Sequence, residues 1–193
     1  MKNLTNLTDQ QLVHLFIEGN TDALGTLVQR HKEKIFTSIY LLVKDKYLAE
    51  DIFQELFIRI IDTLRGGRYA EEGKFLPWVI RIAHNMCLDH FRKVKRTPTI
   101  KTSGDYDLFE VLNFSEPGAD TQIIKGEKHA QVRAMLDHLQ EEQREVIIMR
   151  HYADLSFKEI AELTNSSINT ALGRMRYGLI NLRKLITENQ IAI

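Results

Sequence analysis

The sequence has few of the residues that interrupt helices or cross-link a chain. Its 193 residues include 1 cysteine, 3 prolines and 10 glycines, and alternating apolar and polar runs are scarce. With Cys87 as the single cysteine, an internal disulfide is excluded, which is typical of a reducing cytoplasm, where we expect this protein to reside. The scarcity of proline, glycine and alternation predicts an almost entirely helical fold.

Long apolar runs are also missing. No stretch approaches the roughly 18 consecutive apolar residues that a membrane span needs. The opening residues, MKNLTNLTDQQLVHLF, have no apolar signal core followed by a cleavage site of small residues. We therefore expect no membrane insertion.

The formal net charge is zero, but the charges are unevenly distributed. Six basic residues and one acid occur over 81–101, six acids and one base over 105–127, and four basic residues without an acid over 168–187. Two basic blocks around an acidic one favour two nucleic-acid contacts and a linker. Solvated helix faces are the alternative explanation for any single block.

Capping and breaking residues divide the chain into helices. Thr8 and Gln11 have capping-box spacing and open a helix that Gly19 closes. Further helices are predicted over 21–43, 47–64, 78–95 behind Pro77, 121–140, 141–153, and in a last pair within 158–186. Residues 96–120 hold two of the three prolines and five of the six acids of the acidic block, as a linker does. The prediction is an all-α chain of two small helical domains, 1–96 and 127–193, joined by a flexible acidic linker, 97–126.

The last pair of helices encloses a polar break, in KEIAELTNSSINTALGRMRYG at 158–178. Asn165 falls where a tight turn requires positive φ, which asparagine tolerates well. Ser167 is placed to cap the following helix. This spacing predicts a helix-turn-helix, whose second helix presents hydrogen-bonding side chains to base edges in a major groove. An αα-hairpin in an ordinary bundle is the alternative.

The second helix of this pair has two different sides. Its apolar stripe consists of Ala171, Met175, Leu179, Leu182 and Ile186. Its opposite side carries Asn169, Thr170, Gly173 and Tyr177, with Arg174 and Arg176 at the edges. An acid-free basic outer face suits contact with phosphates.

The first basic block interleaves aromatic and basic residues in EEGKFLPWVIRIAHNMCLDHFRKVKR. Aromatic rings beside bases suit stacking on unpaired nucleotides. Core packing is the competing explanation, and we expect it for Trp78 and Ile82. The histidines and cysteine of this helix, His84, Cys87 and His90, spread over about 120° at 100° per residue and have no fourth ligand nearby. No metal is expected there, and Cys87 is expected to be buried rather than a redox sensor.

Four motifs together resemble the extracytoplasmic-function sigma factors of bacterial RNA polymerase. They are GNTDALGTLVQRHKEKIF, LAEDIFQELFIRII, FLPWVIRIAHNMCLDHFRK and LSFKEIAELTNSSINTALGRMR, in this order along nearly the whole chain. The resemblance implies a region 2-like domain that binds core polymerase and melts the −10 element. It also implies a region 4-like domain that reads the −35 element.

The resemblance assigns residues to each contact. The core-polymerase contact is Asp51, Gln54, Glu55, Phe57 and Arg59. The contact with the unpaired −10 strand is Arg68, Lys74, Arg81, Asn85, Asp89 and Arg92. The duplex −35 contact is Asn169, Thr170, Gly173, Arg174, Arg176, Tyr177, Arg183 and Lys184. It also implies an acidic linker along the polymerase's nucleic-acid channel, an anti-sigma factor as a further partner, no cofactor and no active site.

The chain departs from the family pattern within the helix-turn-helix. Asn165 stands where the family has glycine, and polar Thr164 and Ser166 replace apolar neighbours. Leu172 and Gly173 occupy positions where many relatives carry lysine and serine, so promoter preference is not transferable. Two other functions remain open: a stand-alone helix-turn-helix regulator and a helical protein-interaction adaptor.

Overall fold

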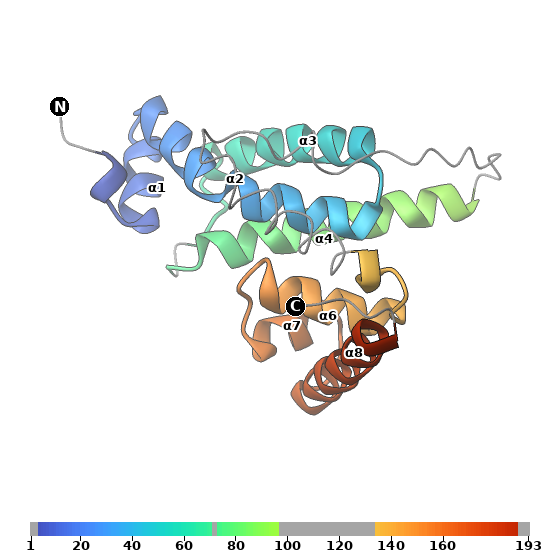
Figure 1. The fold of residues 1–193 in the computed structure, drawn as a ribbon. Helices are drawn as coiled ribbons and strands as arrows, with labels where there is room; N and C mark the ends of the chain where they lie inside the picture. The colour runs from blue at the N-terminus through green and yellow to red at the C-terminus, as the bar shows by residue number, and fades with distance from the viewer. Residues whose placement is uncertain (1–3, 71–72, 97–133, 189–193) are drawn as a thin grey trace, which may run out of the picture. The chain divides into compact units, whose positions relative to one another are not determined.

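The computed structural model describes residues 4–70, 73–96 and 134–188 (Figure 1). The chain divides into two compact units, Met1–Thr102 and Ser103–Ile193. Across the described ranges the regular structure is helical and no strand occurs, which confirms the all-α prediction. The predicted linker, 97–126, lies outside the described residues. None of the helices described is both long and apolar enough to cross a membrane.

The first unit is a bundle centred on its longest helix. It contains η1 (Leu4–Asn6), α1 (Asp9–Ile17), α2 (Thr21–Val43), α3 (Lys46–Arg65) and α4 (Phe75–Arg96). α2 packs against α1, α3 and α4, and these elements lie alongside it in Figure 1. Each of these helices buries an apolar stripe, as amphipathic helices do when they share a core. Fully buried members include Leu12, Leu27, Ile39, Leu56 and Val79.

Local side-chain bonds set the predicted helix ends. Thr8 and Gln11 form the capping box, with the Gln11 N–H donating to Thr8 Oγ1 at 3.3 Å. Gly19 follows α1 with φ 104°, and the side chain of Asn20 caps α2. α2 spans the predicted 21–43, and α3 extends the predicted 47–64 by one residue at each end.

α4 begins earlier than predicted. Pro77 is its third residue rather than a residue ahead of it, and the helix starts at Phe75. The first four N–H groups of an α-helix have no partner inside the helix, so proline costs no hydrogen bond there. The first intrahelical bond runs from the Trp78 N–H to the Lys74 carbonyl at 3.1 Å.

The second unit contains α6 (Glu141–His151), α7 (Phe157–Leu163) and α8 (Ile168–Glu188). α8 packs against both α6 and α7, and the apolar run 146–149 of α6 is buried. The helix predicted over 121–140 is wrong at its end, because 134–136 are helical but 137–139 form a turn. Its part over 121–133 lies outside the described residues.

The predicted apolar stripe of α8 is only partly buried, because Met175, Leu182 and Ile186 are half-buried. Ala171 and Gly178 are the buried residues, whereas Leu179 is 45% exposed. A Cβ at Gly178 would lie 2.9 Å from Ile147 Cδ1 and 3.3 Å from Gln143 Cβ, so the missing side chain lets α6 and α8 approach closely. The buried side of α8 therefore shares Ala171 with the predicted stripe but continues through Gly178 instead of Leu179.

Gly178→Leu should lower the stability of the second unit, because overpacking a close helix contact costs about 1–3 kcal/mol. Gly173→Leu is the matched control, since nothing lies within 4 Å of a Cβ there and leaving glycine gains up to about 1 kcal/mol of helix propensity. Thermal unfolding followed by far-UV circular dichroism measures both. Fluorescence of Trp78, the only tryptophan, reports the first unit. Equal midpoints for the two variants would contradict the close α6–α8 contact.

Candidate functional site

The first group of candidate residues lies along α3. Asp51, Gln54, Glu55 and Arg59 are exposed and Phe57 is half-buried. The Arg59 Nε donates to Glu55 Oε1 at 3.1 Å, one turn away. The ring of Phe57 contacts Phe53 edge-on at 4.9 Å between centroids. α3 therefore exposes charged and amide groups next to the half-buried ring of Phe57.

The apolar residues of α3 do not belong to that surface. Ile52, Leu56 and Ile60 are 6%, 0% and 0% exposed and pack in the core. The exposed apolar side chains of α3 are instead Tyr47 and Ile58. Sequence reasoning missed both, although helical periodicity places Ile58 with Asp51 and Gln54 rather than with Ile52.

The second group lies on α4. Arg81, Asn85 and Asp89 are spaced four residues apart, so they project from one side of the helix, and Arg92 follows one turn later. All four are exposed, and the Arg92 guanidinium donates to Asp89 Oδ1 at 3.0 Å. The opposite side of α4 is core, with Val79 and Ala83 buried. The result is a polar strip that carries two cations.

The loop before α4 is held by aromatic contacts. The Tyr69 ring lies 4.4 Å from Trp78, and Phe75 lies 6.0 Å from Trp78, between ring centroids. Phe75 is 2% exposed, which assigns it to the core, while Trp78 is half-buried, as is Ile82. Arg68 and Lys74, the candidate loop cations, are exposed at either end of this segment, of which 71–72 are not described.

The histidines and cysteine of α4 do not form a metal site. His84 and Cys87 are buried, and His90 is half-buried. In the ranges that the structure covers, no three His, Cys, Asp or Glu residues come together as metal ligands. Burial raises the pKa of the Cys87 thiol to about 12, because a low-dielectric environment disfavours the thiolate.

The polar break between α7 and α8 is a hydrogen-bonded turn. Asn165 adopts φ 49°, as predicted. Ser167 Oγ accepts from the Thr170 N–H at 3.0 Å, which confirms the predicted cap of α8. Thr164 and Ser166 lie hydroxyl to hydroxyl at 3.0 Å, and the Ser166 N–H donates to the Ala161 carbonyl at 2.9 Å. Polar bonds thus hold a turn where the family pattern has apolar packing.

The third group of candidates lies on α8. Asn169, Thr170, Arg176 and Tyr177 are exposed in its N-terminal half, whereas Arg174 is half-buried at the edge of the packed side. Open space surrounds Gly173. Arg183 and Lys184 are exposed in the C-terminal half, where Lys184 lies 3.7 Å from Glu188. The helix presents cations along its length and hydrogen-bonding groups near its start.

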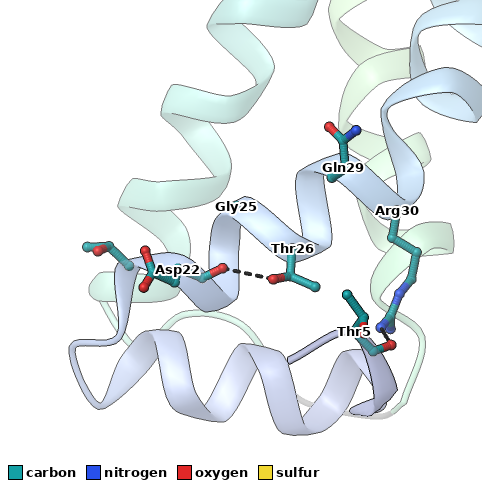
Figure 2. A pocket seen from close by; sticks show the side chains of 7 residues that line it. Thr5, Asp22, Gly25, Thr26, Gln29 and Arg30 are labelled. Atoms are coloured by element: carbon teal, nitrogen blue, oxygen red, sulfur yellow. Dashed lines mark hydrogen bonds between the residues drawn. The ribbon is translucent and has the colours of Figure 1, made fainter. Parts of the chain in front are cut away.

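A hollow in the first unit lies between η1 and the start of α2 (Figure 2). It is lined by Thr5, Thr21, Asp22, Gly25, Thr26, Gln29 and Arg30. The Arg30 guanidinium donates to the carbonyls of Thr5 at 3.0 Å and Leu7 at 2.8 Å, and it pairs with Asp9. The other carboxylate oxygen of Asp9 lies 2.6 Å from His31 Nε2. These bonds hold the N-terminal segment on α2, a structural role that sequence reasoning did not identify.

A helical bundle with a polar cationic strip, and a second unit with a helix-turn-helix, define a class of helical nucleic-acid-binding proteins. Residues 27–97 match the family model of sigma-70 region 2, and residues 129–172 match that of sigma-70 region 4. The chain is 30% identical to the ECF RNA polymerase sigma factor SigW of Bacillus subtilis over 177 residues, covering 89% of this chain and 92% of SigW.

Two solved structures have the same fold. CnrH, solved in complex with the cytosolic domain of CnrY, has a TM-score of 0.64 and 22% identity, covering 93% of this chain and 97% of CnrH. The sigma factor RpoE of Bartonella quintana, solved with the anti-sigma factor NepR, has a TM-score of 0.62 and 16% identity, covering 85% and 96%. The chain belongs to the extracytoplasmic-function sigma factors and directs RNA polymerase to promoters.

Cys87 should resist thiol reagents in the folded protein. With its pKa near 12, the thiol stays protonated at pH 8, and its thiolate fraction is about a thousandfold below that of an exposed cysteine. Labelling by Ellman's reagent at pH 8 should therefore be at least about a hundredfold slower than in the same protein unfolded in guanidinium. Rapid labelling of the folded chain would instead indicate a reactive, sensor-type cysteine.

Proposed function

We propose that this sigma factor works through three separate surfaces. α3 binds core polymerase, α4 with the loop before it captures the unpaired −10 strand, and α8 reads the −35 duplex. The observation that carries this is the alignment of Arg81, Asn85, Asp89 and Arg92 on one exposed side of a helix whose other side is core. The packing of the buried side of α4 holds the helix in place, and the polar residues on its exposed side are therefore held in fixed positions.

The α3 surface suits a protein partner. Its side chains combine acids, an amide and an arginine with the half-buried ring of Phe57. Exposed charges give specificity and faster association rather than much affinity. The affinity would come from apolar area at the centre of the patch.

The α4 strip suits a single strand of DNA. Cations at Arg81 and Arg92 offer contacts to phosphates, and the Asn85 amide offers hydrogen bonds to a base edge. Extruding a base from the duplex costs a few kcal/mol, so a site that binds the extruded base selects the sequence and promotes melting together. The loop cations Arg68 and Lys74 extend the strip toward the same strand.

The N-terminal half of α8 suits the major groove. Asn169 and Thr170 lie in its first turn, where recognition helices contact base edges. Gly173, Arg174, Arg176 and Tyr177 continue along it, and Arg183 and Lys184 are placed for phosphates. Because Ser167 bonds to Thr170 Oγ1 at 2.8 Å, the Thr170 hydroxyl is oriented before DNA arrives.

The remaining roles follow from the family. The domains extend over 1–96 and 127–193, and the acidic segment between them lies along the polymerase's nucleic-acid channel. The polymerase performs the phosphodiester chemistry, and this chain contributes binding and melting in the cytoplasm. An anti-sigma factor is a further partner, in line with the similar fold of RpoE, which was solved with the anti-sigma factor NepR.

Asp51→Arg combined with Gln54→Ala should abolish co-elution with core RNA polymerase on a sizing column. Charge reversal at the proposed contact replaces attraction with repulsion, which costs several kcal/mol across an interface. Glu33→Arg is the matched control, because Glu33 is an exposed acid on α2. Co-elution of the double variant would move the contact away from α3.

Asn85→Ala and Arg174→Ala should separate melting from duplex recognition. Asn85→Ala should reduce permanganate reactivity of unpaired −10 thymines and leave binding to the −35 duplex unchanged. Arg174→Ala should weaken −35 duplex binding about 5- to 150-fold, the worth of a good contact to a base. Each variant is the control for the other, on a promoter that the parent holoenzyme transcribes. If either transcribes like the parent, the role of that residue is wrong.

A further inference from the structure

His31, on α2, connects two parts of the first unit that are distant in the sequence. Its Nε2 lies 2.6 Å from Asp9 Oδ2 at the start of α1, and because a carboxylate only accepts hydrogen bonds, Nε2 is the donor. Its ring lies 6.0 Å from the ring of Phe75 at the start of α4, between centroids. The His31 side chain is 11% exposed. A largely buried ring that makes both contacts has little freedom to rotate.

Phe75 extends this contact to the loop before α4. The Phe75 ring, 2% exposed, lies 6.0 Å from Trp78 and 6.5 Å from Tyr69 between centroids. Tyr69 and Trp78 are 4.4 Å apart by the same measure. We name these four residues the ring cluster: His31, Tyr69, Phe75 and Trp78. Tilted and edge-on aromatic pairs are attractive in addition to the area that they bury, so α2 supports the loop through the His31 ring.

The ring cluster holds the backbone on which the two candidate loop cations lie. Arg68 directly precedes Tyr69, and Lys74 directly precedes Phe75. Because consecutive Cα atoms are only about 3.8 Å apart, a displacement of either ring moves the neighbouring cation with it. A loop that is held in its binding geometry before the ligand arrives loses less conformational entropy on binding.

Anchoring of the N-terminal segment does not account for the ring contact. Asp9 is already paired with Arg30, whose guanidinium also donates to two carbonyls of that segment. An aliphatic side chain at position 31 would bury apolar area as well, but it would offer neither a donor to Asp9 nor a ring to Phe75. The contact between His31 and Phe75 is what connects this anchoring to the loop.

We propose that His31 is a positioning residue for promoter melting. Its ring, oriented by Asp9, holds Phe75 and thereby the loop before α4 in the geometry that receives the unpaired −10 strand. α1 has no residue in the proposed DNA contact, and it is connected to that contact through this one side chain. The role in melting rests on the proposed function of α4 and its loop, whereas the support of the ring cluster by His31 does not.

Two variants of the full-length protein separate the ring from the N-terminal anchoring. His31→Gln keeps an amide donor for Asp9 but removes the ring. Arg30→Ala removes three hydrogen bonds of the N-terminal segment and leaves the ring in place. Trp78, the only tryptophan, reports the cluster by its fluorescence. His31→Gln should shift the emission maximum to longer wavelength, because a looser cluster admits water to the half-buried indole, and Arg30→Ala should lower only the midpoint of thermal unfolding.

Two further variants at the same position guard against misfolding and test rescue. His31→Phe keeps a ring beside Phe75 and loses only the bond to Asp9, so its Trp78 emission should lie closer to that of the parent than His31→Gln does. His31→Leu lacks a ring but keeps an apolar side chain at a largely buried position. It should shift the Trp78 emission in the same direction as His31→Gln, and it replaces that variant if His31→Gln does not fold.

Melting is measured with the holoenzyme on a promoter that the parent transcribes. Permanganate reactivity of −10 thymines should fall about 2- to 10-fold for His31→Gln, the equilibrium effect of losing one aromatic pair. Arg30→Ala should melt the promoter like the parent. Binding of the −35 duplex should not change in either variant, because α8 belongs to the other unit.

Each outcome decides the proposal. Unchanged Trp78 emission in both ring-free variants would overturn it, and so would an equal shift in Arg30→Ala, because anchoring alone would then explain the effect. A shifted emission with parental melting would overturn the role in melting. Asn85→Ala on the same promoter distinguishes the two failures: if it also melts like the parent, the proposed −10 contact is wrong and the support of the ring cluster stands.

Discussion

The close contact between α6 and α8 at Gly178 decides which sides of the second unit face outward. With no side chain at Gly178, the backbone of α8 lies against Ile147 and Gln143, and the buried side of the helix is fixed around that point. The first-turn residues that we propose to read the −35 duplex are exposed as a consequence, and so are the apolar side chains of Leu172 and Leu179. A helix that buries one side exposes the opposite side, so this close contact helps to set the rotation of α8 about its own axis.

In the first unit, the side that each helix buries also decides which side is exposed, and here the buried residues have large apolar side chains. α3 buries Ile52, Leu56 and Ile60, and this orientation leaves Asp51 and Ile58 outward. α4 likewise buries one side and presents its polar strip on the other. Because each proposed contact lies on the reverse of a core stripe, substitutions in the core would move these surfaces without touching them.

The helix-turn-helix shows how a departure from a family pattern is accommodated. Thr164 and Ser166 bond to each other, and the Thr164 hydroxyl donates to the Ile160 carbonyl at 2.8 Å. Apolar residues at these positions would contribute burial, whereas here each polar group finds a partner close by in the chain. A polar turn of this kind avoids the cost of unsatisfied groups while keeping the same bend.

The sequence by itself determined the features whose partners lie within a few residues. The Thr8–Gln11 capping box and the Ser167 cap are hydrogen bonds between near neighbours in the chain, and the positive φ of Asn165 is a property of one residue. The helix boundaries that these features set were predicted closely. Tertiary structure alone decided which side of α8 is buried, that Phe75 is core while Trp78 is half-buried, and that Ile58 and Leu179 are exposed. Apolar periodicity gives a stripe but not its partner, because a glycine that admits a neighbouring helix has no hydrophobic signal of its own.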